Sequence, residues 1–333
     1  MGEMRNRVVV ISGASSGFGR GAALKFAENG AKVVLAARRR RLLKQLADEI
    51  RKAKGEALVV ETDVSSSSEV EELANKAVEK FGRIDVWVNN AGVGAVARFD
   101  ETPLEEHEQV IQTNLMGTIY GSYVALQQFR ERGKGVLINV SSFAGKVAAP
   151  YLSSYSASKF GVRGLGIALR QELEQHGEDG IHVCTVMPVS FDTPFFEHAA
   201  NHTGKPVQPI PPVYDPQKVV DVIYDLARDP EDEVVVGPAG KMASVAERIA
   251  PRLVRKFMGK NAHKAQMQQK ESARDKSGSV FKPMSSGEGV YGGNKDEGSN
   301  LATALGLAVP IGMGAVYFLL QRKHRRSELE EVA

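Results

Sequence analysis

Apolar and amphipathic segments alternate along roughly the first 240 residues of the chain. The short apolar runs, rich in Val, Ile and Leu, predict strands at Val8–Ile11, Val33–Ala36, Leu58–Glu61, Val86–Asn89, Val136–Val140, His182–Met187 and Glu233–Val236. The amphipathic segments predict a helix that follows a glycine-rich turn and ends near Asn29, and helices at Leu42–Lys54, Val70–Phe81, Leu104–Arg132, Ser154–His176, Pro216–Arg228 and Ala243–Met258. Mostly apolar strands that alternate with helices favour parallel pairing through right-handed crossovers. The pattern therefore predicts an α/β domain with one doubly wound parallel sheet.

The composition changes after this domain. We expect residues 1–258 to form the folded domain, because residues 259–300 are rich in Gly, Ser, Lys and Gln and predict a flexible polar linker. Leu301–Leu320 is almost wholly apolar. As a helix it would be about 30 Å long, which is the thickness of the hydrocarbon core of a bilayer. It predicts a transmembrane helix, followed by a charged tail at 321–333; a C-terminal helix docked on the domain is the alternative.

Charge and cysteine content narrow the partners and the compartment. The net charge of +3 does not indicate the basic surface that nucleic-acid-binding proteins have. The single cysteine, Cys184, excludes an internal disulfide and any multi-cysteine metal site, and no metal is expected. No signal peptide precedes the first strand, so we expect a cytoplasmic domain that the C-terminal helix anchors to a membrane. The basic run Arg322–Arg326 also favours the cytoplasm. One membrane span cannot place both the domain and this basic run in the cytoplasm. The C-terminal segment could therefore cross the membrane, form a hairpin in it, or lie at its surface.

A glycine-rich turn joins the first strand to the first helix. Gly13, Gly17 and Gly19 have the spacing Gly-x-x-x-Gly-x-Gly. Glycine permits a positive φ and a close approach of ligand to backbone, and the helix N-terminus that follows attracts phosphate. The turn therefore predicts a dinucleotide site that consists of Gly13, Ser15, Ser16, Gly17, Phe18 and Gly19; a turn without a ligand is the alternative.

The end of the second strand bears on the choice of dinucleotide. Domains that prefer NAD usually have Asp or Glu here, which binds the ribose 2′-hydroxyl. This chain has Ala37 and Arg38, so no carboxylate repels a 2′-phosphate and Arg38 can bind it. NADP(H) is therefore favoured, with NAD(H) as the alternative. We expect Arg39–Arg41 to be the solvated start of the next helix.

Three polar residues predict proton transfer. Ser142 follows the fifth strand, and Tyr155 and Lys159 share one face of a helix near the carboxyl end of that strand. An unperturbed tyrosine has a pKa of about 10, and a neighbouring ammonium group lowers it. Tyr155 can then exchange a proton with a carbonyl or alcohol oxygen to which Ser142 donates a hydrogen bond. The alternatives are that Ser142 is only a serine in the turn after the strand, and that Tyr155 is only a half-buried aromatic residue.

Together these motifs resemble the short-chain dehydrogenase/reductase family, over residues 6–240. The pieces that carry the resemblance, in order, are the glycine turn, Asp63-Val64, Asn89-Asn90-Ala91-Gly92, Asn114, and Ser142 with Tyr155 and Lys159. The resemblance implies a Rossmann-type parallel sheet of seven strands in the order 3-2-1-4-5-6-7, with helices on both faces and a further C-terminal helix. It also implies pairing into a homodimer or homotetramer.

The resemblance further implies a role for each residue. Tyr155 would be the general acid/base, and Lys159 would also bind the nicotinamide ribose. Ser142 would orient the substrate, and Asn114 would support a proton relay through water. The implied cofactor contacts beyond the glycine turn are Asp63, Val64, Asn90, Ala91, Gly92, Tyr155, Lys159, Pro188 and Thr193. Val189 stands where the family usually has glycine.

Aromatic residues and prolines between Thr193 and Tyr214 predict a lid over the substrate. With Phe143, Val147, Phe195 and Phe196 they suggest an apolar pocket. We therefore expect an oxidoreductase that interconverts an apolar alcohol and a ketone or aldehyde. The alternatives are a non-catalytic dinucleotide-binding sensor or scaffold, and a 3-ketoacyl reductase or epimerase on the same fold.

Overall fold

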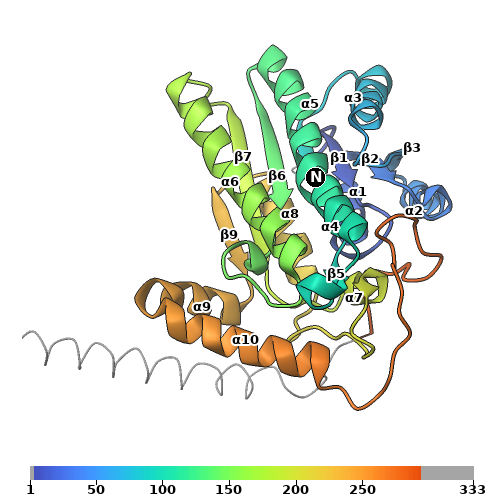
Figure 1. The fold of residues 1–333 in the computed structure, drawn as a ribbon. Coiled ribbons are helices and arrows are strands. Elements are labelled where there is room, and N and C mark those ends of the chain that lie inside the picture. Colours follow the sequence, from blue (N-terminus) through green and yellow to red (C-terminus); the bar gives the residue numbers. More distant parts are fainter. Residues whose placement is uncertain (1–3, 294–333) are drawn as a thin grey trace, which may run out of the picture.

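The strands of the main sheet are all parallel, in the order β3-β2-β1-β4-β6-β7-β9 (Figure 1). The structure is a computed structural model that describes residues 4–293. The sheet strands are β1 (Val8–Ser12), β2 (Lys32–Ala37), β3 (Glu56–Glu61), β4 (Val86–Asn89), β6 (Gly135–Val140), β7 (Ile181–Pro188) and β9 (Glu233–Val236). Two short strands, β5 (Ala95–Val96) and β8 (Ala200–Asn201), form a separate parallel pair. The predicted fold class and strand order are therefore confirmed, since β6, β7 and β9 are the fifth, sixth and seventh predicted strands.

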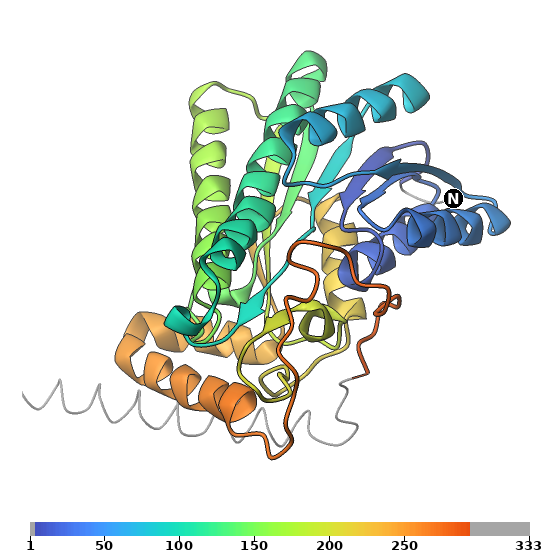
Figure 2. The same cartoon turned by 45° about the vertical axis from the view of Figure 1, so that its right-hand side comes forward.

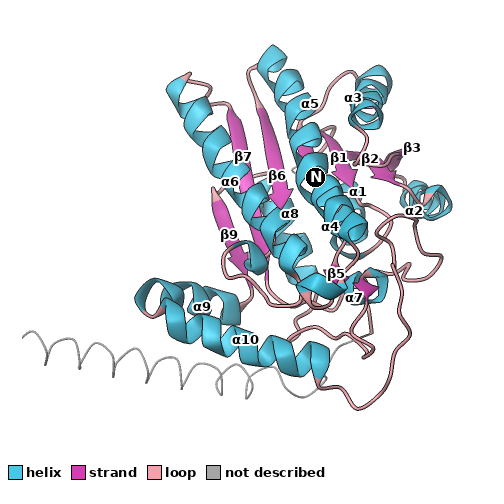
Figure 3. Cartoon of the chain, viewed as in Figure 1, coloured by secondary structure: helices cyan, strands magenta, loops and turns pink. Residues whose placement is uncertain are grey.

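Helices cover both faces of the sheet (Figure 3). They are α1 (Gly17–Glu28), α2 (Arg40–Lys52), α3 (Ser67–Phe81), α4 (Leu104–Ile111), α5 (Gly117–Arg132), α6 (Ser153–Gln175), α7 (Phe195–His198), α8 (Gln217–Leu226), α9 (Pro238–Ile249) and α10 (Pro251–Met267). One apolar cluster packs α1, α2 and α8 on the sheet around Phe26. A second packs α3, α5 and α6 on the opposite face around Trp87 and Phe129. The central strands β1, β4 and β6 thus bury both of their faces, as the sequence pattern requires, whereas the edge strand β3 is partly exposed.

The long helix predicted at Leu104–Arg132 is interrupted. Between α4 and α5 the residues Gln112–Met116 form a π-helical stretch, in which hydrogen bonds join residues five apart instead of four. Asn114 lies in this stretch and is fully buried. Apolar spacing shows only that a helix is present, so the sequence pattern did not reveal the wider turn.

The helix predicted at Ala243–Met258 is two helices, and the second is longer than predicted. The break falls at Ala250, whose φ of −136° and ψ of 62° are outside the helical region. Pro251 explains it, because proline disfavours helical backbone in the residue before it. Helix α10 then continues to Met267, past the predicted domain boundary at residue 258. Residues 268–293 follow along the domain (Figure 2).

The predicted transmembrane helix at 301–320 and the charged tail at 321–333 lie outside the described residues. Within residues 4–293, no helix combines the length and the apolar character that a membrane span requires.

Candidate active site

The loops after β1, β2, β3, β4, β6 and β7 meet at one edge of the sheet, because parallel strands bring their carboxyl ends together. These loops line one cavity of about 370 Å³. All the predicted site residues line it, except Gly19 and Asn114. The structure therefore brings together residues that are as much as 180 positions apart in the sequence, from Gly13 to Thr193.

The glycine turn packs tightly against the loop after β4. Gly13 and Gly17 have positive φ angles of 68° and 55°. A Cβ on Gly13 would lie 2.8 Å from the side-chain nitrogen of Asn90, and a Cβ on Gly19 would lie 2.4 Å from the carbonyl oxygen of Gly13. The Asn90 amide also donates to the carbonyl of Ser12 at 3.0 Å. These contacts require glycine at 13 and 19 and leave the N-terminus of α1 at the cavity wall.

The loops after β3 and β4 continue this wall. Asp63 and Val64 follow β3, and Asn90–Gly92 follow β4. A Cβ on Gly92 would lie 3.4 Å from Asn114 Oδ1 and 3.6 Å from Lys159 Nζ. The bare backbone at position 92 therefore lies close to both of these side chains.

Tyr155 and Lys159 project from the first turns of α6 into the same cavity. A hydrogen bond between the side chains of Ser142 and Tyr155 favours the phenolate form of the tyrosine. Lys159 Nζ donates to the carbonyl of Val140, at the end of β6, at 2.8 Å. It lies 5.7 Å from the centre of the Tyr155 ring, and the Phe195 ring lies 5.1 Å from that ring. The three predicted residues thus form one cluster at the junction of β6 and α6.

Burial dominates the acidity of this cluster. It raises the pKa of Tyr155 to about 12, and the hydrogen bond with Ser142 opposes the rise. Burial also lowers the pKa of Lys159 from 10.5 to about 8. The expected lowering of the Tyr155 pKa by Lys159 is therefore not found. The reason is that the amine is itself 4% exposed, and burial destabilises its charged form.

The side chain of Asn114 fixes the loop after β4. Its Oδ1 accepts from the backbone N–H of Val93 at 2.8 Å, and its Nδ2 donates to the Val93 carbonyl at 2.9 Å. Nδ2 also donates to Ser158 Oγ at 3.0 Å, which ties the loop to α6. The amide therefore holds the wall beside Lys159.

Arg38 contacts the C-terminal part of the described chain. Its two terminal nitrogens donate to the carbonyls of Phe281 at 3.0 Å and Ser279 at 2.5 Å. One of them lies 3.8 Å from the carboxylate of Asp63. Arg38 lines the cavity, and β2 ends at Ala37, which has no carboxylate side chain.

Arg39 is a site residue that the sequence analysis missed. We expected it to be solvated, but it donates to Ser15 Oγ at 3.1 Å and to Ser16 Oγ at 2.7 Å. It lies directly before α2, so its backbone can leave the strand direction and its side chain can turn back over the glycine turn. Its position next to Arg38 could have indicated this contact, but the helical pattern of the following residues favoured a solvated side chain.

The other end of the cavity is apolar. Thr193 lies against the glycine turn, where a Cβ on Gly17 would be 3.7 Å from Thr193 Cβ. The predicted lid contributes Phe195 and Phe196, and α9 and α10 add a wall that was not predicted. The apolar lining comprises Phe143, Val147, Ala149, Leu152, Phe195, Phe196, Ile210, Met242, Val254, Phe257 and Met258. Among residues 4–293, no group of three or more His, Cys, Asp or Glu side chains has the arrangement of a metal site.

Comparison with known proteins agrees with this geometry. The sequence pattern of the short chain dehydrogenase family matches residues 7–203. YxnA of Bacillus subtilis (strain 168), an uncharacterized oxidoreductase, is 34% identical over 272 residues, which make up 81% of this chain and 76% of that protein.

Solved structures share the fold. A short chain dehydrogenase/reductase from Burkholderia phymatum in complex with NAD superposes with a TM-score of 0.68 at 27% identity, over 77% of this chain and 97% of that one. An alcohol dehydrogenase from the archaeon Thermococcus sibiricus, complexed with 5-hydroxy-NADP, gives a TM-score of 0.60 at 28% identity, over 69% of this chain and 95% of that one. The matched family pattern, which spans more than half of the sequence, and this shared fold show that the chain belongs to the short-chain dehydrogenase family of oxidoreductases.

Proposed function

We propose that the chain interconverts an apolar alcohol and its ketone or aldehyde with a nicotinamide dinucleotide, and that Tyr155 is the general acid/base. The observation that carries this proposal is the Ser142–Tyr155 hydrogen bond, with Lys159 beside it, in the cavity that the glycine turn also lines. Family membership supports an oxidoreductase, and the solved structures described above hold NAD or an NADP derivative. The substrate, the cofactor preference and the residue roles are our proposals.

The residues of the groove fit a dinucleotide. At Gly13 and Gly19 a Cβ would fill the space that the backbone leaves. The α1 N-terminus would offer a diphosphate the N–H groups that follow Gly17, whose own N–H bonds to the carbonyl of Gly289. Asp63 and Val64 would border the adenine, Asn90–Gly92 the middle of the cofactor, and Pro188 and Thr193 the nicotinamide end. When bound, the nicotinamide supplies or accepts the hydride.

The protein handles the proton at the substrate oxygen. Ser142 and Tyr155 present two hydroxyl groups to the same space, so both can hydrogen-bond to one carbonyl oxygen. In reduction Tyr155 donates its proton to this oxygen, and in oxidation it accepts the alcohol proton. The Lys159 ammonium, 5.7 Å from the centre of the Tyr155 ring, would attract the phenolate that forms in reduction and supply the proton that restores the hydroxyl, although it does not lower the pKa of the resting tyrosine. Asn114 holds the loop beside Lys159, and a water relay to solvent along this side remains our prediction.

Arg38 and Arg39 support a preference for NADP(H). Both guanidinium groups line the groove, and Arg39 already contacts two serines of the glycine turn. Their charge complements a 2′-phosphate, and Ala37 leaves no carboxylate at the end of β2 to oppose it. Hydrogen bonds from Arg38 to backbone carbonyls can be exchanged for stronger, charge-assisted bonds to phosphate.

Attachment to a membrane through residues 301–320 also remains a proposal, with the domain in the cytoplasm. Support within the described residues comes from α9 and the start of α10. Met242, Val245, Ile249 and Leu253 are 40%, 60%, 40% and 51% exposed there. The exposed charged residues among them are basic, such as Arg252. Such a face suits an anionic membrane surface beside the apolar end of the cavity. The pairing of two or four copies of the chain stays a prediction. The exposed aromatic rings of Tyr123 on α5 and Phe160 on α6 support it.

Replacing Tyr155 by Phe tests the proposed chemistry. In a screen of apolar ketones and alcohols that follows the absorbance of the reduced cofactor, Tyr155→Phe should lose about 100- to 10,000-fold in kcat, because the general acid/base is gone. NADPH affinity should change little. Tyr151→Phe is the matched control, since its hydroxyl bonds to His263, and it should keep the native rate. Turnover by Tyr155→Phe at the native rate would contradict the proposed role of Tyr155, whereas NADPH binding by the native protein without turnover would favour a binding module.

Replacing Lys159 by Met tests the cost of burying this amine. The unfolded amine keeps its proton up to about pH 10.5, whereas the folded one loses it near pH 8, so the unfolded state binds more protons between these values. Native stability therefore rises with pH across this window. At pH 7 Lys159→Met should raise the free energy of unfolding by about 1–3 kcal/mol, and this gain should shrink toward pH 10. Urea unfolding at pH 7 and 10 measures it, with Lys44→Met on the surface as control; a gain that does not depend on pH would contradict the account.

Cofactor preference can be measured directly. Native protein should bind NADPH more tightly than NADH, and Arg38→Ala and Arg39→Ala should each weaken NADPH binding about 10- to 100-fold, the effect of one lost charge-assisted bond. NADH binding should change little. Arg40→Ala is the control, because that side chain is 63% exposed and pairs with Glu61. Equal affinities of the native protein for the two cofactors would overturn the preference.

Membrane attachment is tested by flotation with vesicles of phosphatidylcholine and phosphatidylserine. The full chain should float with the vesicles even at high salt, because an inserted apolar helix is not released by screening. A chain that ends at Gly293 should bind weakly and only at low salt. Equal behaviour of the two chains would show that residues 294–333 do not anchor the protein.

A further inference from the structure

The segment Asp275–Gly292, which we call the strap, runs along the carboxyl edge of the sheet (Figures 1 and 2). It comes from the end of α10, passes α7, and reaches the N-termini of α1 and α2. Hydrogen bonds attach it to the domain at its beginning, its middle and its end. The strap lies within the segment that the sequence analysis assigned to a linker.

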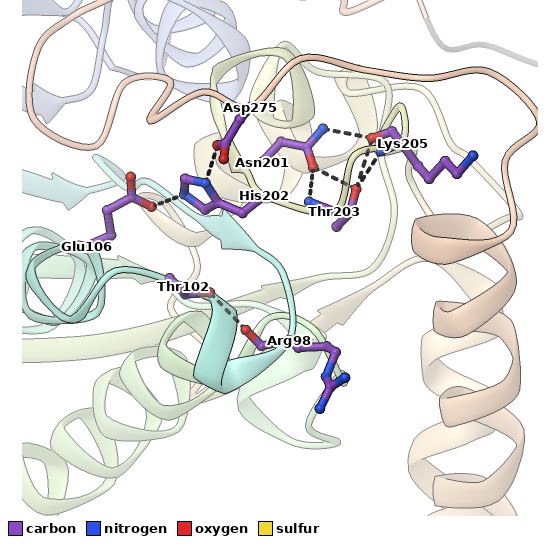
Figure 4. A network of polar contacts seen from close by, with 8 residues as sticks. All are labelled: Arg98, Thr102, Glu106, Asn201, His202, Thr203, Lys205 and Asp275. Carbon is purple, nitrogen blue, oxygen red and sulfur yellow. Dashed lines mark hydrogen bonds and ion pairs between the residues drawn. The ribbon is translucent and has the colours of Figure 1, made fainter.

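Its beginning is attached at His202 (Figure 4). The ring lies between two carboxylates: Nε2 is 2.8 Å from Glu106 Oε2 on α4, and Nδ1 contacts Asp275 of the strap. Burial would lower the pKa of His202, but the two carboxylates outweigh it and raise the pKa. Next to this contact, the backbones of Asn201 and Lys276 exchange two hydrogen bonds, of 2.7 and 3.2 Å. A charged contact and a short antiparallel pair thus join the strap to β8.

The middle of the strap is attached by the buried side chain of Val280 and by a backbone hydrogen bond from Ser279. Val280 is 0% exposed and packs in a small apolar cluster with Val93 and Val110, against which Tyr155 also packs. The Ser279 N–H donates to the carbonyl of His198, at the end of α7, at 2.7 Å. The neighbouring Phe281 is 45% exposed. Val280 is therefore the apolar anchor of the strap.

The far end of the strap lies on the glycine turn. The carbonyl of Gly289 accepts the N–H of Gly17 at 2.9 Å, and Arg39 donates to the carbonyls of Ser286 and Gly287 at 2.9 and 3.2 Å. The Gly292 N–H donates to the carbonyl of Asp192 at 3.2 Å, in the loop after β7. The strap therefore joins the two loops that the cofactor would lie between.

The strap covers the groove without filling it. Ser279 and Pro283 line the same cavity as Asp63 and Gly13, so the open space continues beneath the strap. The strap faces Arg38 and Arg39 with backbone carbonyls, which carry no net charge and can give way to a phosphate. Its contacts with Gly17, Arg38 and Arg39 lie where the diphosphate and the adenosine would bind, whereas Val280 packs in the cluster next to Tyr155.

We propose that the strap forms the outer wall of the dinucleotide site, and that it must lift for the cofactor to enter or leave. This inference rests on the proposed function only in requiring a nicotinamide dinucleotide in the groove. The strap buries one apolar side chain completely and is otherwise held by hydrogen bonds and ion pairs, many of them to exposed partners. Because it has no apolar core of its own to offset the entropy of ordering it, the strap opens at lower cost than the sheet does. With the strap closed, the cofactor is retained between turnovers.

The test is the rate at which the full-length protein releases NADPH, followed by its fluorescence after mixing with excess NADP+. Gly287 has a φ of 70°, and a Cβ there would lie 2.1 Å from His198 Nε2, so Gly287→Ala should loosen the strap. Gly289→Ala is the matched control, because its Cβ would meet no atom closer than 3.5 Å. Gly287→Ala should release NADPH about tenfold faster and bind it more weakly, whereas Gly289→Ala should match the native rate.

A second pair of variants keeps the test independent of local strain at Gly287. Val280→Asp places a carboxylate in the apolar cluster and should also speed release, while Phe281→Ala should not. NADPH should slow amide hydrogen exchange of the strap in the native protein and not in Val280→Asp. Unchanged release in both Gly287→Ala and Val280→Asp would overturn the proposal, as would tighter NADPH binding, which would make the strap a competitor of the cofactor. Failure to bind either dinucleotide would defeat both proposals, whereas an active Tyr155→Phe would defeat only the proposed chemistry.

Discussion

Parallel pairing of β1 with β4, and of β4 with β6, is the constraint on which the site depends. It brings the ends of these strands to one edge, where the glycine turn, Gly92 and Ser142 come together. The loops are then tied across the strands. Asn90 donates to the carbonyl of Ser12, and Lys159 donates to the carbonyl of Val140. The hydrogen bonds that complete the sheet edge therefore also set the distances within the site.

The site is costly to the fold in two ways. Lys159 and Tyr155 are buried polar groups. Burial lowers the pKa of Lys159 and raises that of Tyr155, so it favours the neutral form of each. Glycine at positions 13, 19 and 92 leaves backbone without side-chain packing, and a Cβ at each would meet neighbouring atoms within 3.4 Å. The two apolar clusters on the faces of the sheet offset these costs. A stable sheet can thus hold a destabilised edge at which chemistry takes place.

The sequence was most informative where a residue type has one use. The glycine spacing, and a Tyr and a Lys four residues apart after a strand, predicted a site that contains Gly13, Gly17, Tyr155 and Lys159, and the structure brings these residues to one cavity. The apolar runs predicted the strands, because burial on both faces leaves a clear pattern, and the family resemblance implied their order. It did not reveal the π-helical stretch around Asn114, whose spacing differs from that of an α-helix by less than the pattern can resolve.

The rest depended on long-range contacts. Arg39 was expected to be solvated, and its contacts with Ser15 and Ser16 exist only because the end of β2 lies beside the turn after β1. The strap was expected to be a linker because its composition is polar and glycine-rich. It nevertheless packs on the domain, because its attachments are mostly backbone hydrogen bonds, which composition does not show. Val280 is the one fully buried apolar side chain within it, too little for a pattern.

The central claim is that hydride moves between a nicotinamide and a carbonyl carbon while Tyr155 moves the proton at the oxygen. The most direct measurement uses NADPH that carries deuterium at the transferred position of the nicotinamide, with an apolar ketone that the protein reduces. Mass spectrometry of the alcohol should show one deuterium on the former carbonyl carbon in the native protein, and labelled alcohol should form about 100- to 10,000-fold more slowly in Tyr155→Phe. An alcohol without deuterium, or a labelled alcohol formed equally fast by Tyr155→Phe, would contradict the account.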